Sequence, residues 1–199
     1  MTWTPETLAP WYATPAGSKV ARAVVAAVQG VEDARWVGAL RPLLLEVGYA
    51  APYRACWPTA LADAVLPPAL GEDNYMECRY DRVVLAHALE DLAADAAELL
   101  TRCAQALRPD GLLMVVVPAS FALCRLGKGP FAAGRCFTAG KLQAVLMEAG
   151  FKPRAVLRVA GVIVALASRT VGGTRVLVHK PVGGKVSTMP AGITTLRGL

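Results

Sequence analysis

Residues 81–118 constrain the fold of this chain more strongly than any other stretch, because they predict a strand, a helix and a second strand in direct succession. DRVVLAHAL contains a short apolar run, and EDLAADAAELLTRCAQAL has leucines and alanines at helical spacing with acids near its start. After RPDG, LLMVVVP is the clearest strand pattern in the chain. Strands that alternate with helices predict an α/β protein with a mostly parallel sheet.

The rest of the chain continues this alternation. Thr14 followed by Pro15 is typical of a helix start, and valines at helical spacing extend a helix over about residues 15–29. A short helix after Pro52 must stop at Pro58. Further strands are predicted at 43–47, 59–67, 153–159 and 161–168, with a very short strand within 71–80 and an additional or alternative last strand over 174–181.

A second well-delimited helix covers TAGKLQAVLMEAGF, where Thr138 is the expected N-cap and Gly150 the stop. A chain of 199 residues is long enough for one good core, so we expect a single domain over residues 1–182. Residues 183–199 are expected to form a flexible C-terminal tail.

Composition and charge exclude several classes of protein. No basic stretch followed by an apolar run opens the chain, and VLRVAGVIVALA is shorter than the roughly 20 residues of a membrane helix. Five cysteines without CxxC spacing or paired histidines predict buried thiols in a reducing cytoplasm and no metal site. The formal charge of +6 comes from scattered cations, which argues against a nucleic-acid-binding stripe.

The order Asp81, strand, His87, acidic helix, LRPDG, strand resembles the second half of class I S-adenosylmethionine-dependent methyltransferases. FTAGKLQAVLMEAGFKPRAVLRV is similar to their last helix and sixth strand, and ALRPDGLLMVVVP is the most specific piece. WYATPAGSKVAR resembles the opening of a small bacterial branch of that superfamily. The resemblance covers about residues 11–170. It implies a Rossmann-like, mostly parallel seven-stranded sheet with helices on both faces, and S-adenosylmethionine as cofactor.

In that family a loop after the first strand, roughly E-x-G-x-G-x-G, binds the cofactor. The corresponding residues of this chain are Glu46, Gly48, Tyr49 and Ala50, followed by Pro52. Only the first glycine is present. Ala50 adds a methyl group where the backbone would approach the methionine portion, and Pro52 removes an N–H group from the following helix. The resemblance therefore implies a weakened cofactor site.

The family also uses an acid after its second strand for the ribose and an acid near its third strand for the adenine. Asp63 lies several residues before the end of the predicted second strand, which makes it a poor ribose ligand. Glu72 and Asp73 are the candidates for the adenine. The alternative for these acids is a solvated position without a ligand.

His87 is expected at the mouth of a strand, near the methyl acceptor, where a neutral imidazole can take a proton from a hydroxyl or amine. The alternative is a hydrogen-bonded structural histidine. Tyr12, Tyr49 and Tyr53 are candidates for the walls of the same cleft. The loop over residues 119–137, with cations that include Arg125 and Lys128, is expected over the carboxyl face of the sheet, where it would select an anionic acceptor or dock an acidic partner.

Two hypotheses for function follow. The first is a cytoplasmic S-adenosylmethionine-dependent methyltransferase that acts on a small-molecule or protein acceptor. The second is a methyltransferase-fold protein that has lost cofactor binding and acts as a partner or regulatory subunit, since a fold outlives the site grafted on it. The sequence identifies neither the acceptor, nor a protein partner, nor a homo-oligomeric state.

Overall fold

The computed structural model describes residues 5–31, 42–66, 78–90, 95–120 and 136–170. The strands are β1 (Leu43–Gly48), β2 (Leu61–Leu66), β3 (Tyr80–Ala86), β4 (Leu107–Pro118), β5 (Phe151–Val159) and β6 (Val162–Arg169). The helices are α1 (Pro5–Tyr12), α2 (Pro15–Val31), the 3-10 helix η2 (Ala51–Cys56), α3 (Ala96–Ala106) and α4 (Ala139–Glu148).

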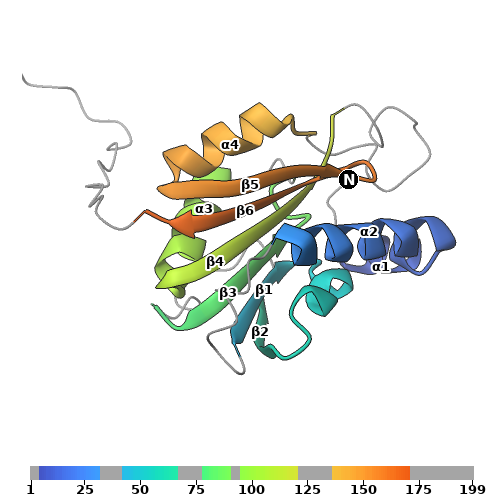
Figure 1. Ribbon diagram of the computed structural model, residues 1–199, viewed down its shortest axis with the longest axis horizontal. Coiled ribbons are helices and arrows are strands. Elements are labelled where there is room, and N and C mark those ends of the chain that lie inside the picture. Colours follow the sequence, from blue (N-terminus) through green and yellow to red (C-terminus); the bar gives the residue numbers. More distant parts are fainter. Residues whose placement is uncertain (1–4, 32–41, 67–77, 91–94, 121–135, 171–199) are drawn as a thin grey trace, which may run out of the picture.

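The strands form one sheet in the order β2-β1-β3-β4-β6-β5 (Figure 1). β1 pairs in parallel with β2 and β3, and β3 pairs in parallel with β4. β6 runs antiparallel to both of its neighbours, β4 and β5. The prediction of a mostly parallel α/β sheet is confirmed with six strands. Most of the stretch predicted to hold another strand, 71–80, and all of 174–181 lie outside the described residues.

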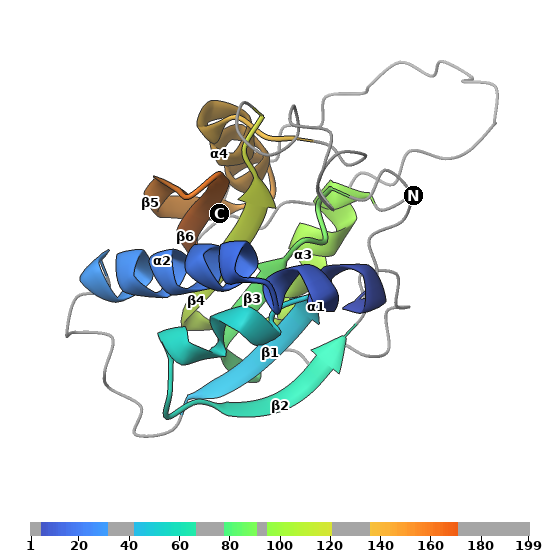
Figure 2. The same cartoon turned by 90° about the vertical axis from the view of Figure 1, so that its right-hand side faces the viewer.

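Helices cover both faces of the sheet, as predicted (Figures 1 and 2). The buried residues of α3 and α4 pack with one face of β1, β3, β4 and β6 in a first core cluster. A second cluster joins α1, α2 and η2 to the other face. The central strands are buried on both sides, which explains why their sequences are almost continuously apolar.

Local signals place the helix ends where the sequence predicts them. The Thr14 hydroxyl accepts a hydrogen bond from the N–H of Gly17 at 3.2 Å, and Pro15 opens α2. The Thr138 hydroxyl accepts from the N–H of Lys141, and Gly150 follows α4 at φ +84°. These capping interactions satisfy N–H groups that have no partner inside the helix.

Two boundaries differ from the prediction. α3 begins at Ala96 rather than near residue 90, because the carboxylate of Asp95 accepts from the N–H groups of Ala97 and Glu98 and so caps the helix there. β4 begins at Leu107, so the RPDG segment belongs to the strand. The first difference matters, because Glu90 becomes a residue of the turn after β3 rather than a helical acid.

The cysteines also differ from the expected set of buried thiols. Cys56 and Cys103 are buried thiols, and burial raises the pKa of the Cys103 thiol to about 12. Cys78, however, is exposed, and Cys136 is disulfide-bonded. The prediction is therefore wrong for these two residues.

Candidate functional site

Four parallel strands end at the same edge of the sheet: β1 at Gly48, β2 at Leu66, β3 at Ala86 and β4 at Pro118. Ligands of open α/β sheets bind beyond this carboxyl edge. Figure 2 shows α1 lying beside this edge, on the face that α2 covers. The candidate site is therefore built from the ends of β1 and β3, the turn after each and the last residue of α1.

Gly48 packs closely against the backbone at the end of the neighbouring strand β3. Its φ is +75°, and a Cβ atom built on it would lie 2.3 Å from the carbonyl oxygen of Ala86. The next N–H group, that of Tyr49, donates a hydrogen bond to the same Ala86 oxygen at 2.9 Å. The glycine and the first N–H of this turn therefore serve the junction between β1 and β3.

Glu46 is held by an arginine of the chain itself. Its side chain is only 1% exposed, and both carboxylate oxygens accept hydrogen bonds from Arg54 of η2, at 2.5 Å from Nε and 2.8 Å from Nη2. This bidentate contact with Glu46 raises the pKa of the Arg54 guanidinium. Glu46 therefore fixes η2 against β1, a role that sequence reasoning missed.

His87 is the centre of a buried polar network at the end of β3. Its Nδ1 lies 2.9 Å from Oε1 of Glu90, and its Nε2 lies 2.6 Å from the Tyr12 hydroxyl and 3.2 Å from the Tyr53 hydroxyl. The two tyrosine hydroxyls also hydrogen-bond to each other. An ionised carboxylate only accepts, so Nδ1–H donates to Glu90, and Nε2 of a neutral ring accepts from a tyrosine. We call these four residues the His87 network.

The backbone of His87 supports a functional interpretation. Its φ is +55°, which is uncommon for a residue other than glycine, and its N–H donates to the carbonyl oxygen of Val116 at 3.0 Å. Strained residues of this kind cluster at functional sites. Here the conformation turns the imidazole away from the strand and into the network.

Glu90 is the member of the His87 network with a buried oxygen that lacks a hydrogen-bond donor within the described part of the chain. The residue is 2% exposed, and its Oε2 makes no hydrogen bond among the described residues. A buried carboxylate oxygen without a donor is costly. Glu90 was not predicted as a site residue, although its spacing of three residues from His87 was a signal available in the sequence.

Burial changes the acidity of the two tyrosines. The pKa of Tyr12 is raised mainly by desolvation and also by the charge of Glu90, while its hydrogen bond with Tyr53 lowers it. The pKa of Tyr53 is raised most by burial, and next by its charge interaction and hydrogen bond with Tyr12. Both phenols therefore remain protonated at neutral pH and can pass protons along the network without acting as bases themselves.

These shifts predict a loss of stability at alkaline pH. Because the folded-state pKa values lie above the ordinary value of 10.0, the unfolded chain loses these protons first as the pH rises. Their contribution to stability is complete below pH 10 and declines above it. Denaturant unfolding across this range should show the decline, and the double variant Tyr12→Phe, Tyr53→Phe should show a shallower one. Equal slopes in the two proteins would contradict the buried-phenol description.

Tyr49 and Ala50 occupy different environments. Tyr49 is half-buried and lies 5.6 Å from the Tyr12 ring, measured between ring centroids. Ala50 is 2% exposed and packs in the second core cluster. Tyr12 and Tyr49 line an open groove of about 520 Å³ between the N-terminal helices and the start of η2. Its other lining residues are Ala9, Ala13, Ser18, Ala21, Arg22, Ala51 and Pro52.

Of the acids predicted for the ribose and the adenine, Asp63 alone belongs to the described residues. Asp63 lies within β2, three residues before its end at Leu66, at an irregularity of the β1–β2 register. Glu72, Asp73 and the cations Arg125 and Lys128 lie outside the described residues.

The described residues contain no cluster of histidine, cysteine and acidic residues that could hold a metal ion. Among their helices, none combines the length and the apolar character required to cross a bilayer.

Solved methyltransferase structures share this fold. A SAM dependent methyltransferase from Aquifex aeolicus aligns with a TM-score of 0.56 at 13% identity, over 83% of this chain and 98% of that chain. A SAM-dependent methyltransferase from Thermotoga maritima, described as a possible histamine N-methyltransferase, aligns with a TM-score of 0.53 at 13% identity, over 82% of this chain and 95% of that chain. These likenesses show the fold.

A third neighbour was solved with ligands. The 1,6-didemethyltoxoflavin-N1-methyltransferase of Burkholderia thailandensis, with bound 1,6-didemethyltoxoflavin and S-adenosylhomocysteine, aligns with a TM-score of 0.52 at 21% identity over 83% of each chain. Some neighbours are longer: the match to the pyocyanin biosynthetic protein PhzM covers 82% of this chain and 61% of PhzM, with a TM-score of 0.50 at 15% identity. No family model and no curated protein matches the sequence.

Proposed function

We propose that this chain, which has the fold of class I S-adenosylmethionine-dependent methyltransferases, is itself such an enzyme. We further propose that it binds the cofactor weakly and acts on a small molecule with an O–H or N–H group that must lose its proton. The His87 network at the carboxyl edge of the sheet is the observation that carries this proposal. A small-molecule acceptor agrees with the 1,6-didemethyltoxoflavin bound to the Burkholderia neighbour.

The His87 network provides a route for one proton. Tyr12 lines the groove and its hydroxyl belongs to the His87 network, so in this proposal that hydroxyl links the acceptor to His87. As that oxygen takes the acceptor's proton, its own proton passes to Nε2 of His87, 2.6 Å away. Glu90, on the opposite side of the ring, stabilises the resulting imidazolium. In this proposal His87 acts through Tyr12, whereas the sequence-based prediction has His87 take the proton from the acceptor itself.

The groove beside Tyr49 is the place where the cofactor would lie. S-adenosylmethionine, when bound, supplies an electrophilic methyl group, so the protein needs mainly to align the reactants. Tyr49 would contact the cofactor, and Arg22 at the groove wall would pair with a carboxylate. Few backbone donors remain for it, because the Tyr49 N–H is bonded to Ala86 and Pro52 has none. Weak binding follows from this shortage.

A second candidate function is favoured by the same shortage. Ala86 takes the space beside Gly48, Arg54 donates to both carboxylate oxygens of Glu46, and the Tyr49 N–H is already bonded. A chain whose cofactor-binding groups are committed to its own structure would suit a partner or regulatory subunit without catalysis. The His87 network would then only stabilise the packing of α1.

Calorimetric titration with S-adenosylhomocysteine separates the two candidates. We expect a dissociation constant in the micromolar to millimolar range, and Arg22→Gln should weaken it. Lys19→Gln, which removes the same charge from an exposed position of α2 outside the groove, should not. The absence of heat at millimolar ligand would reject the enzyme in favour of the partner role, and submicromolar affinity would reject the weakened site.

A further inference from the structure

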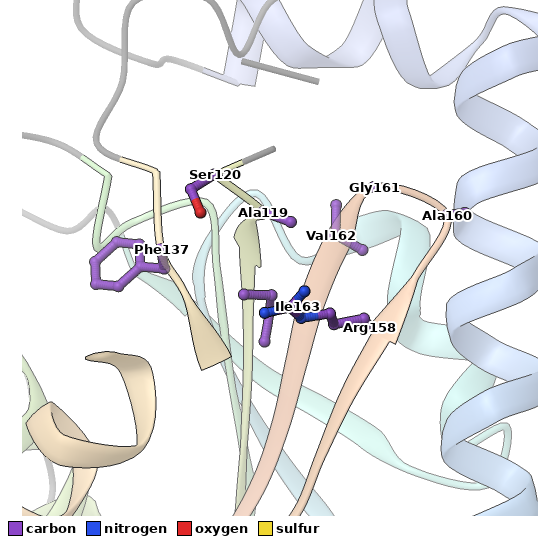
Figure 3. A pocket seen from close by; sticks show the side chains of 8 residues that line it. All are labelled: Ala119, Ser120, Phe137, Arg158, Ala160, Gly161, Val162 and Ile163. Atoms are coloured by element: carbon purple, nitrogen blue, oxygen red, sulfur yellow. The ribbon is translucent and has the colours of Figure 1, made fainter. Parts of the chain in front are cut away.

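A second pocket lies at the carboxyl edge of the sheet, beyond the end of β4 and beside the turn between β5 and β6 (Figure 3). Its volume is about 170 Å³. It is lined by Ala119, Ser120, Phe137, Arg158, Ala160, Gly161, Val162 and Ile163. Because β4 pairs with β3 through Val116 and Ala86, this pocket stands one strand away from the His87 network.

The pocket is apolar apart from two side chains. Ile163 pairs with Val117 of β4 on one side and with Arg158 of β5 on the other, so the three residues form a row across the sheet. Figure 3 shows the Arg158 side chain reaching along the pocket toward Ile163 and the Ser120 hydroxyl on the β4 side. Phe137 adds an aromatic wall.

The charge of Arg158 is not neutralised within the described structure. It forms no ion pair there, and the residues that line the pocket include no acid. The Ser120 hydroxyl makes no hydrogen bond there either, since only its backbone N–H is bonded, to Phe137. A guanidinium and a free hydroxyl on an apolar wall are suited to an anionic group attached to an apolar body.

We propose that this pocket binds the anionic end of the methyl acceptor, so that the acceptor is a small apolar or aromatic molecule with a carboxylate or phosphate group. An apolar cavity of about 150 Å³ can hold benzene, so this volume is sufficient for one ring. The identification of this ligand as the methyl acceptor rests on the proposed function. The recognition of an anion by Arg158 can be measured without catalysis.

The test titrates the full-length protein with benzoate, phenyl phosphate and benzylamine, observed by protein NMR. We expect both anions to bind and shift signals of the β5–β6 turn, and benzylamine not to do so. Arg158→Gln should weaken binding of the anions about tenfold or more, as expected for a hydrogen bond to a charged group. Lys152→Gln, an exposed cation earlier on the same strand, is the matched control and should leave binding unchanged.

Each outcome decides for or against the anion site. Equal binding of benzylamine, unchanged affinity in Arg158→Gln, or no binding of either anion to the wild type would overturn it. A preference for one anion identifies the carboxylate or the phosphate. Melting curves confirm that the variant is folded, and Ser120→Ala, which retains the charge, should cause a smaller loss. If the anions bind through Arg158 while S-adenosylhomocysteine does not, the anion site stands and the methyltransferase proposal fails.

Discussion

Replacing Gly48 with alanine is expected to lower the free energy of unfolding by about 2 to 5 kcal/mol, through backbone strain and overpacking together. The new Cβ atom would lie 2.3 Å from the Ala86 carbonyl oxygen, so a strand end has to move. A φ of +75° adds strain for any residue with a side chain. Chemical denaturation measures the loss directly.

Two other glycines separate these causes. Gly150 has a φ of +84° but open space around it, so Gly150→Ala should show the strain alone, about 1 kcal/mol. Gly140, in the first turn of α4, has neither problem, and Gly140→Ala should be neutral or stabilising by up to about 1 kcal/mol. If Gly48→Ala resembled either control, the tight junction of β1 and β3 would be refuted.

Removing the imidazole of His87 is expected to cost about 1 to 3 kcal/mol, the range for leaving a buried hydrogen-bonding group without its partner. Asparagine is the suitable replacement, because it tolerates a positive φ but is shorter than histidine. Glu90 would then lose the only hydrogen bond of its buried carboxylate among the described residues. Unfolding measurements on His87→Asn test this.

A double-mutant cycle shows whether the loss belongs to the pair. Glu90→Leu removes the carboxylate, and the variant with both changes should be no less stable than His87→Asn alone. The coupling energy is expected to be about 1 to 3 kcal/mol. Losses that simply add would mean that His87 and Glu90 act independently, which would also remove the physical basis for the proposed proton route.

The fold was largely predictable because its signals are local. Short apolar runs that end at glycine or proline predicted β1 and the β5–β6 hairpin, whose turn places Ala160 and Gly161 at positive φ. Thr14 and Thr138 predicted helix starts because an N-cap acts on N–H groups within the next turn. The α3 boundary was misplaced because Glu90 and Asp95 are both acids suited to a helix start, and only the capping geometry distinguishes them.

The candidate site was predictable only in part, because its contacts are distant in the sequence. The order of strands placed His87 and Gly48 at one edge, and this required no knowledge of their partners. The partners of His87 come from distant parts of the sequence. Tyr12 lies 75 positions before His87, and Tyr53 lies 34 positions before it. Pairing Glu46 with Arg54 depended on η2 turning back over β1, which no pattern in the loop indicates.

Tyr12 and His87 are 75 positions apart in the sequence, and this separation affects the order in which the chain can fold. A ribosome synthesises a chain from its N-terminal side, so α1 emerges before the other described helices. Its tyrosine nevertheless has no imidazole to bind until β3 has been synthesised, and the His87 N–H has no acceptor until Val116 of β4 has followed. Ordering so long an intervening segment carries an entropic cost that only an assembled sheet offsets. Although α1 is synthesised before the other described helices, it is therefore expected to be among the last of them to reach its final position.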